Sequence, residues 1–190
     1  MAQHVKHRLR HPWRRVFPSW KVLLALALLI AGTAHAESEA GVKAAYLFNF
    51  AKLAEWPAAA FESAKSPLVI GVVGRDAVSD DLMRRYARAT ANGRPVEIRR
   101  VSAGSPRELR ACHIIFIPQS EDADGIISAV QGAPVLIVGE SEGFARHGGA
   151  LAFVKQEGTL KFEANPKAAA RNGVTVSSRL LRVACSVVGK

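Results

Sequence analysis

The strongest constraint on the fold is a set of four short apolar runs separated by segments with helical spacing. The first, Leu68–Val73, is almost wholly apolar and β-branched, which is typical of a strand buried on both faces. Similar runs follow at Val96–Val101, His113–Ile117 and Val135–Val138. Strands that alternate with helices at this spacing indicate βαβ units. The sequence therefore predicts an α/β fold, a three-layer sandwich with a mostly parallel central sheet.

Capping residues and apolar spacing predict the helices between these strands. Val42–Trp56 has apolar residues at helical spacing, and Pro57 is expected to end it. Ser79 is the predicted cap of a second helix, and Ser105 has capping-box spacing to Glu108 before a third. The remaining predicted bounds are Asp80–Ala89 and Asp122–Val130.

The pattern changes after the fourth run. Ala150–Val154 and Thr159–Glu163 flank a polar segment with Gly158, which predicts a β-hairpin. Two C-terminal helices are expected, at Pro166–Arg171 with Asn165 as its cap, and from Ser177 or Ser178 through Val188. The predicted sandwich thus carries a C-terminal hairpin and helices.

The first 36 residues have the composition of an export signal. They contain no acidic residue, and a basic segment precedes the apolar run Val22–Ala31 and the sequence Ala34-His35-Ala36. We expect cleavage after Ala36, a single domain over residues 37–190, and a periplasmic location. Arg14-Arg15 resembles a twin-arginine signal, but the flanking Trp13 and Pro18 favour the general secretory route.

Charge argues against nucleic-acid binding. The whole chain has 26 basic and 16 acidic residues, and six basic residues belong to the leader, so 20 remain against 16 in the mature part. A nucleic-acid-binding domain usually carries a strong basic excess on one face.

Residues that could support catalysis or bind metal are sparse after the leader. His113 begins an apolar strand and is interpreted as a hydrogen-bonded structural histidine, while His147 lies in a glycine-rich turn. Neither has ligands at metal-binding spacing, so we expect no metal, no cofactor and no enzymatic activity. Cys112 and Cys185 permit one disulfide or two buried thiols, and the sequence leaves both open.

Three charged residues follow predicted strands and are candidates for ligand binding. Arg75 lies in a glycine-rich turn, and Glu121 and Glu142 lie in acidic clusters after the third and fourth strands. The carboxyl ends of parallel strands share one edge, where ligands tend to bind. A tight turn and helix N-capping explain the same residues.

An ordered set of motifs resembles the YfiR family of periplasmic proteins over essentially the whole mature chain. The motifs are Val42–Lys52 with Glu55–Pro57, Cys112–Ile117 with Ser120-Glu121, Glu142–Phe144 with Gly148-Gly149, Leu160–Asn165, and Ser177–Leu181.

The resemblance implies a repressor. Such proteins are homodimers with an α/β sandwich fold that bind the periplasmic sensor part of an inner-membrane diguanylate cyclase, YfiN, and hold it inactive. An OmpA-like outer-membrane lipoprotein, YfiB, sequesters them. The function that the resemblance implies is therefore to lower cyclic di-GMP and restrain biofilm formation. The alternative is a small-ligand sensor that acts on another membrane protein.

The resemblance also implies a partner surface and departs from the family in its cysteines. The partner-binding positions carried over are Glu163, Asn165, Val176, Ser178 and Leu181. From the residues alone, Val176 and Leu181 could equally be core and Asn165 a helix cap. Redox-controlled members have four cysteines, but this chain has two.

Overall fold

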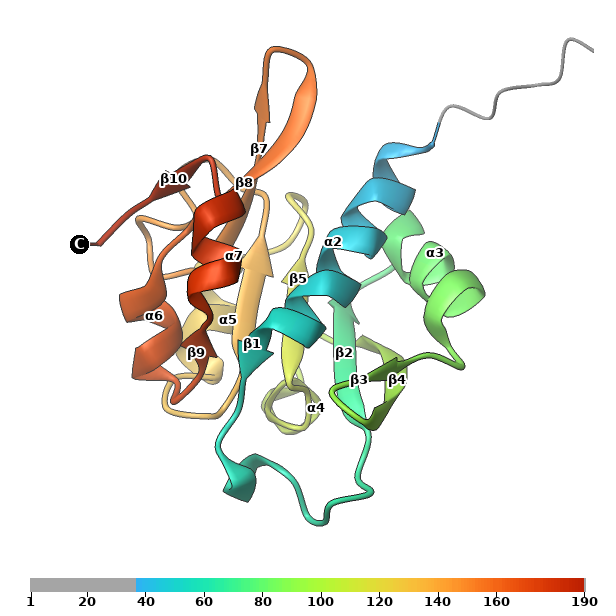
Figure 1. Ribbon diagram of the computed structural model, residues 1–190. Coiled ribbons are helices and arrows are strands. Elements are labelled where there is room, and N and C mark those ends of the chain that lie inside the picture. The colour runs from blue at the N-terminus through green and yellow to red at the C-terminus, as the bar shows by residue number, and fades with distance from the viewer. Residues whose placement is uncertain (1–36, 190) are drawn as a thin grey trace, which may run out of the picture. The chain divides into compact units, whose positions relative to one another are not determined.

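The computed structural model describes residues 37–189, so the predicted signal peptide at residues 1–36 lies outside the described residues. Figure 1 shows the elements in chain order. The helices are α2 (Glu39–Leu53), α3 (Ala77–Tyr86), α4 (Pro106–Arg110), α5 (Ala123–Ala129), α6 (Pro166–Arg171) and α7 (Ser178–Val183), with a short 3₁₀ turn at Ala58–Ala60. The strands are β1 (Ala54–Glu55), β2 (Leu68–Val73), β3 (Thr90–Ala91), β4 (Arg94–Val101), β5 (Ile114–Ile117), β6 (Leu136–Gly139), β7 (Leu151–Gln156), β8 (Thr159–Ala164), β9 (Thr175–Val176) and β10 (Ser186–Val187).

The main sheet has the order β10-β8-β7-β6-β5-β2-β4-β3. Its central pairs, from β4 across to β7, are all parallel, whereas β7 and β8 form an antiparallel hairpin. A separate antiparallel pair joins β1 to β9. This arrangement confirms the predicted α/β class with a mostly parallel sheet and a C-terminal hairpin.

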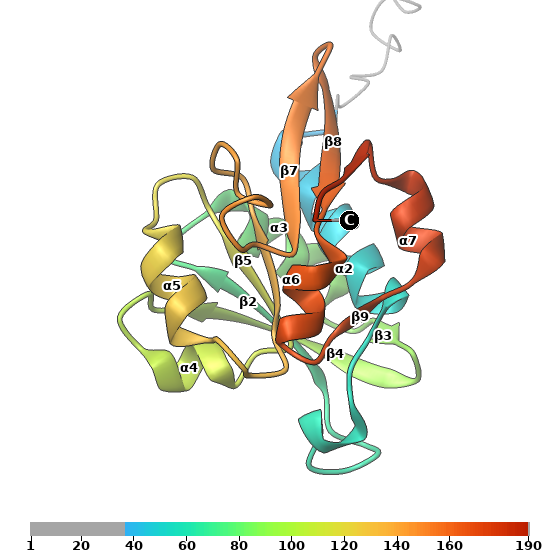
Figure 2. The ribbon, with the colours of Figure 1, turned by 90° about the vertical axis from the view of Figure 1, so that its left-hand side faces the viewer.

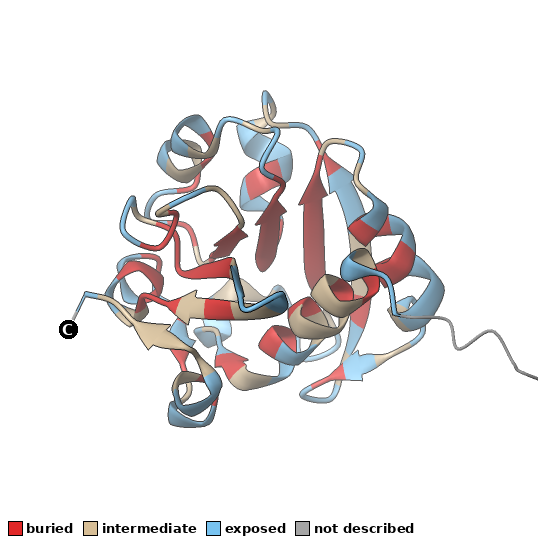
Figure 3. Ribbon diagram, turned by 90° about the horizontal axis from the view of Figure 1, so that it is seen from above, coloured by how far each residue is buried: buried red, intermediate tan, exposed pale blue. Residues whose placement is uncertain are grey.

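Helices cover both faces of the sheet and create two hydrophobic cores. Figure 2 shows α4 and α5 on one side, and α2 and α7 on the other. The larger core lies under α2 and α3 and contains Leu47, Phe50 and Leu82; the smaller lies under α4 and α5 and contains Leu109 and Ile126. The central strands between them are buried (Figure 3), so the three layers are as predicted. Within residues 37–189, none of the helices has the length and apolar character needed to cross a bilayer.

The boundaries of α2 differ from the prediction at both ends. The helix begins at Glu39, because the Ser38 hydroxyl accepts a hydrogen bond from the Gly41 amide and caps it. It ends at Leu53 rather than at Trp56, because Ala54 and Glu55 are extended and pair with β9. A tertiary partner, and not Pro57, therefore ends the helix.

Three other predictions are corrected. Asp76, not Ser79, caps α3, and Ser79 is buried inside that helix. Ser105 precedes α4 without a side-chain capping bond, and the Glu108 carboxylate accepts from the Ser102 amide rather than from the Ser105 amide, so the capping box does not form. The last helix ends at Val183 rather than at Val188, because Ser186–Val187 forms β10 beside β8.

β4 is not buried on both faces as its apolar pattern suggested. Val96 and Val101 are buried, but Arg99 and Arg100 are exposed. β4 lies next to the edge of the sheet, with only the two-residue strand β3 beyond it, and Arg100 bonds to Ser79 and Asp80 of α3 at the surface.

The β7–β8 hairpin projects beyond the body of the domain (Figure 1). Its turn is Glu157-Gly158, and both residues have positive φ (51° and 75°). A two-residue hairpin turn of type I′ requires positive φ at both positions, and its twist matches that of the flanking strands. At its base Phe153 and Phe162 are direct partners and contact Tyr46 of α2, with ring centroids 5.8 and 5.6 Å away. Aromatic packing therefore fixes the hairpin to α2.

The loop from Glu140 to Gly149 is shaped around one aromatic ring. Phe144 is buried, and its ring packs directly on the backbone of Gly139 and Gly149, where a Cβ would overlap it. The glycines are therefore required by this close approach, and the loop borders a groove described below.

Substituting Gly149 with alanine tests this packing. We expect Gly149→Ala to lower the free energy of unfolding by about 1–3 kcal/mol, because the added methyl overpacks the core. Gly104→Ala is the control, since its Cβ would have only a distant neighbour, and it should change stability by less than about 0.5 kcal/mol. Urea unfolding measures both, and equal effects would contradict the packing account.

Candidate functional site

Three hollows lie at different places on the domain, and four of the ten candidate site residues line them: Cys112, Glu142, Glu163 and Ser178. The amino-edge cavity, about 290 Å³, includes Phe61, Arg99, Arg110, Cys112 and His113. The carboxyl-edge groove, about 410 Å³, is lined by Glu39, Gln119, Glu140, Glu142, Arg146, Lys155, Leu160 and Glu163, among others. The α2–α7 groove, about 580 Å³, is lined by Lys52, Leu53, Glu55, Asn92, Ser177, Ser178, Arg179 and Arg182.

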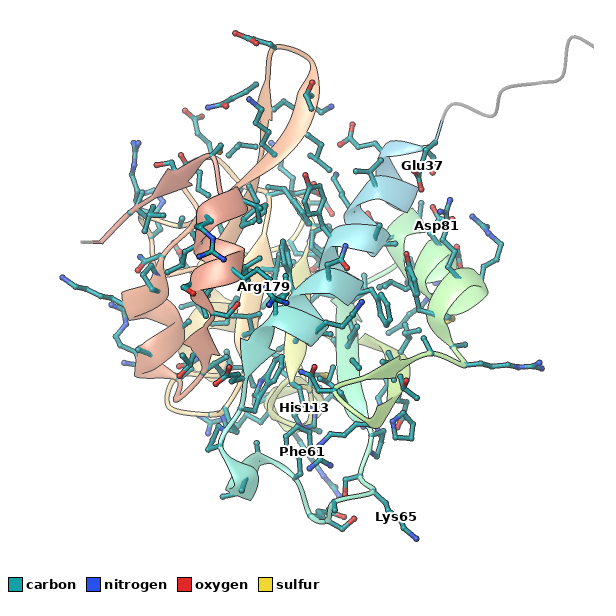
Figure 4. All side chains as sticks on the ribbon, in the orientation of Figure 1. Glu37, Phe61, Lys65, Asp81, His113 and Arg179 are labelled. Atoms are coloured by element: carbon teal, nitrogen blue, oxygen red, sulfur yellow. The ribbon has the colours of Figure 1, made fainter. Side chains whose placement is uncertain are left out.

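His113 in the amino-edge cavity has a structural role, as predicted. Its Nδ1 accepts a hydrogen bond from the Val69 amide (3.1 Å), and its Nε2 therefore carries the proton and donates to the Ala60 carbonyl (3.1 Å). Burial lowers the pKa of its imidazole. Figure 4 shows Phe61 beside it, and the two rings stack with centroids 4.4 Å apart. The histidine therefore ties the loop after β1 to β2.

The basic groups of the amino-edge cavity are already engaged with the protein. Arg110 donates from Nε to the Ala129 carbonyl (2.8 Å), and Arg99 donates to Glu97 (2.6 Å). Burial raises the pKa of the Cys112 thiol to about 11, so the thiol is protonated at neutral pH and is a poor nucleophile. Cys112 and His113 do not form a nucleophile–base pair, because both histidine nitrogens are bonded to the backbone.

Both cysteines are free, and an intrachain disulfide between them is incompatible with the sheet order. Cys112 precedes β5 and Cys185 precedes β10, with three strands between. Four strand spacings amount to roughly 19 Å, whereas bridged cysteines have Cα atoms within about 7 Å. Their thiols instead contact the carbonyls of Glu108 and Phe162.

The three ligand-binding candidates are only partly brought together. The Glu121 carboxylate lies against Gly74, and hence beside the turn that holds Arg75. Glu142 lines the carboxyl-edge groove, but Arg75 and Glu121 do not. The structure therefore does not bring all three residues to one hollow, and of the three only Glu142 lines one of the hollows described above.

An ion-pair network that the sequence did not reveal borders the carboxyl-edge groove. Lys43 of α2 has a side chain only 12% exposed and contacts both Glu39 (2.9 Å) and Glu140. Glu39 also pairs with Lys155 of the hairpin (2.7 Å). Hydrogen bonds from Lys155 and Lys43 lower the pKa of Glu39 to about 2. Burial opposes the charge of Lys43, but its bonds to Glu140 and Glu39 outweigh that effect and raise its pKa.

The network joins three separate segments, the first turn of α2, the loop after β6 and the hairpin. Only the i, i+4 spacing of Glu39 and Lys43 was visible in the sequence. The other contacts depend on the tertiary fold, so no local motif could have identified them.

The five partner-binding candidates do not form one surface. Asn165 and Val176 are each only 7% exposed. Asn165 caps α6, and its side-chain amide donates to the Ala145 carbonyl (2.7 Å). Val176 belongs to the larger core. Glu163 lines the carboxyl-edge groove. Ser178 and Leu181 lie on α7, where Ser178 is exposed and Leu181 packs half-buried on the core. Only Glu163, Ser178 and Leu181 are therefore placed to reach a partner.

The described residues contain no group of three or more His, Cys, Asp or Glu side chains that could hold a metal ion. The accessible features are instead the two charged grooves, one at each end of α2.

The Glu39 network gives stability a defined pH dependence. The pKa of the Glu39 carboxylate in the folded protein (about 2) is below the usual 4.5. The ionised carboxylate therefore contributes to the free energy of unfolding above pH 4.5, and this contribution is lost as pH falls toward 2. Glu39→Gln should therefore destabilise the protein by less than about 1 kcal/mol at pH 7, since the pair is partly exposed.

That difference should shrink progressively as pH falls from 4.5 to 2, as measured by urea unfolding across the range. Glu142→Gln is the control, because Glu142 belongs to none of the ion pairs among residues 37–189. A Glu39→Gln effect that persists unchanged at pH 2 would refute the network.

The thiols should be distinguishable by their reactivity. We expect two thiols per chain on titration of denatured, unreduced protein, and slow alkylation of Cys112 in the native state because it is buried and protonated. An intact mass lower by two hydrogens before reduction would show a disulfide and contradict the structure.

A search of curated proteins finds no match. Among solved structures, a conserved domain protein from Vibrio cholerae O1 biovar El Tor is 15% identical, with a TM-score of 0.47 over 63% of this chain and 54% of that one. An ABC domain in complex with L-Trp from Streptococcus pneumonia is 14% identical, with a TM-score of 0.45 over 63% and 55%.

The chain thus spans little more than half the length of each of these two proteins. The match to a protein-family model covers more of this chain than the matches to these two structures do. Residues 40–185, which are most of the chain and nearly all of the described domain, match the family model described as YfiR/HmsC-like. The chain therefore belongs to the YfiR/HmsC-like family.

Proposed function

We propose that this protein is a periplasmic regulator that binds the sensor part of an inner-membrane diguanylate cyclase and holds the cyclase inactive. The observation that carries the proposal is the match to the YfiR/HmsC-like family over residues 40–185. A role in cyclic di-GMP signalling follows from that membership. The inhibitory direction, the cyclase as partner, sequestration by an OmpA-like lipoprotein, homodimer formation and export by a cleaved leader all remain part of the proposal.

The surface chemistry supports binding rather than catalysis. The buried Cys112 and His113 are held by backbone contacts, whereas charged side chains gather at the two grooves. In this proposal Ser178 and Leu181 on α7, together with Glu163, contact the partner. Asn165 and Val176 act indirectly, by capping α6 and by packing β9 against the larger core.

A second candidate function is binding of a small ligand in the carboxyl-edge groove. The observation that favours it is the combination of carboxylates and Arg146 with the apolar side chains of Phe153 and Leu160 in one hollow. Binding pockets usually combine apolar walls with a few polar groups. Ligand-dependent thermal stabilisation that Glu142→Gln or Glu163→Gln abolishes would support it, because a ligand of the native state raises apparent stability.

The regulatory proposal is tested by altering α7 in the full-length exported protein. We expect deletion of the gene to raise cyclic di-GMP, and Ser178→Tyr to raise it toward the deletion level, because a bulky ring at an exposed helix position obstructs docking. Leu181→Asp should act in the same direction. Cyclic di-GMP measured in cell extracts provides the result.

The matched control is Ser128→Tyr, at an exposed position on α5 across the sheet from α7. It should restore the wild-type level in the deletion strain. Immunoblots and melting curves establish that the variants fold and accumulate, which matters most for the half-buried Leu181. Unchanged cyclic di-GMP on deletion, under every envelope stress applied, would remove the proposal.

A further inference from the structure

The outer side of α7 combines cationic and apolar side chains on one helix face. Arg179, Arg182 and Val183 are at i, i+3 and i+4 and therefore share a side of the helix. All three are exposed. Among residues 37–189 two large apolar residues are exposed, Met83 and Val183, and Val183 is the more exposed, with 65% of its surface accessible to solvent. Leu180 of the same helix is buried in the larger core.

The C-terminal end of α2 continues this cationic face. Lys52, in the last turn of α2, lines the α2–α7 groove together with Arg179 and Arg182. Figure 4 shows Arg179 between α7 and the C-terminal half of α2. Two elements far apart in sequence thus contribute three positive charges to one groove.

These charges are not neutralised within the domain. The ion pairs found among residues 37–189 do not include Lys52, Arg179 or Arg182. One acidic residue, Glu55, lines the same groove. By contrast, the cations of the carboxyl-edge network, Lys43 and Lys155, each have a carboxylate partner. The groove therefore carries an excess positive charge that an acidic partner would complement.

The composition of the groove favours a macromolecular segment over a small anion. Small-molecule sites are mostly apolar and enclosing, but Leu53 is the one apolar residue that lines this hollow. The neighbouring apolar contact, Val183, is on the open face of the helix. Interfaces join such an apolar anchor to arginines that position the partner.

We propose that the α2–α7 groove binds an acidic segment of a protein partner. Carboxylates of that segment pair with Lys52, Arg179 and Arg182, and an apolar side chain packs on Val183. The inference rests on the protein-binding part of the proposed function and specifies the chemistry of the partner.

Site-specific photo-cross-linking in the full-length exported protein tests this assignment. A benzophenone amino acid replaces Val183, and a control replaces Met83 on α3, the other exposed large apolar residue. We expect an adduct at position 183 whose cross-linked peptide, identified by mass spectrometry, is rich in Asp and Glu. The Met83 control should not give that adduct.

Charge reversal supplies the decisive comparison. Arg179→Glu with Arg182→Glu should lower the adduct yield about tenfold or more, because facing like charges are strongly unfavourable. The matched control is Arg88→Glu with Arg107→Glu, two exposed arginines elsewhere that make no ion pair among the described residues. Since all four side chains are exposed, melting temperatures should be unchanged. Reversing the acidic residues of the captured segment should restore the adduct.

The inference is overturned if position 183 gives no adduct, if the adduct is a lipid, a nucleotide or a neutral or basic segment, or if charge reversal leaves the yield unchanged. Cyclic di-GMP in the deletion strain is measured separately. An acidic adduct with unchanged cyclic di-GMP supports the groove assignment and refutes the cyclase as the regulated protein. A changed cyclic di-GMP level without the adduct refutes the groove assignment alone.

Discussion

The packing of α2 across the sheet is the interaction on which the rest of the structure depends. Phe50 is fully buried between Phe153 and Phe162, with ring centroids 6.0 and 5.0 Å away, and Tyr46 contacts the same two rings. This cluster joins the first helix to a hairpin formed by residues about a hundred positions later in the chain. Because aromatic side chains bury large apolar areas, it sets where α2 lies.

The position of α2 in turn determines both charged grooves. Its first turn brings Glu39 and Lys43 to the loop after β6 and to the hairpin, which forms the carboxyl-edge network. Its last turn brings Lys52 beside α7, where the cations have no such partners among the described residues. One end of the helix is therefore electrostatically satisfied, and the other retains charge available to a partner.

The fold was predictable because its signals are local. The apolar run of β2, the Asn165 cap of α6 and the glycine of the β7–β8 turn each specify their own element. Element ends set by distant strands were not predictable: α2 stops where Ala54 meets Val176, and α7 stops where Ser186 meets Glu163. The same limit applies to the sites, since the three cations of the α2–α7 groove come from two helices more than a hundred residues apart. Family resemblance proposed the partner-binding positions but could not distinguish the buried Asn165 and Val176 from accessible positions on α7.

The central claim of the proposed function is that the protein is exported and lowers cyclic di-GMP from the periplasmic side. The most direct measurement is cyclic di-GMP in a deletion strain that produces either the full-length protein or a variant lacking residues 2–36, at matched levels. The account predicts that only the full-length protein lowers cyclic di-GMP, because only the exported domain reaches the sensor part of the cyclase. Equal lowering by the variant retained in the cytoplasm, or no change with either, would contradict it.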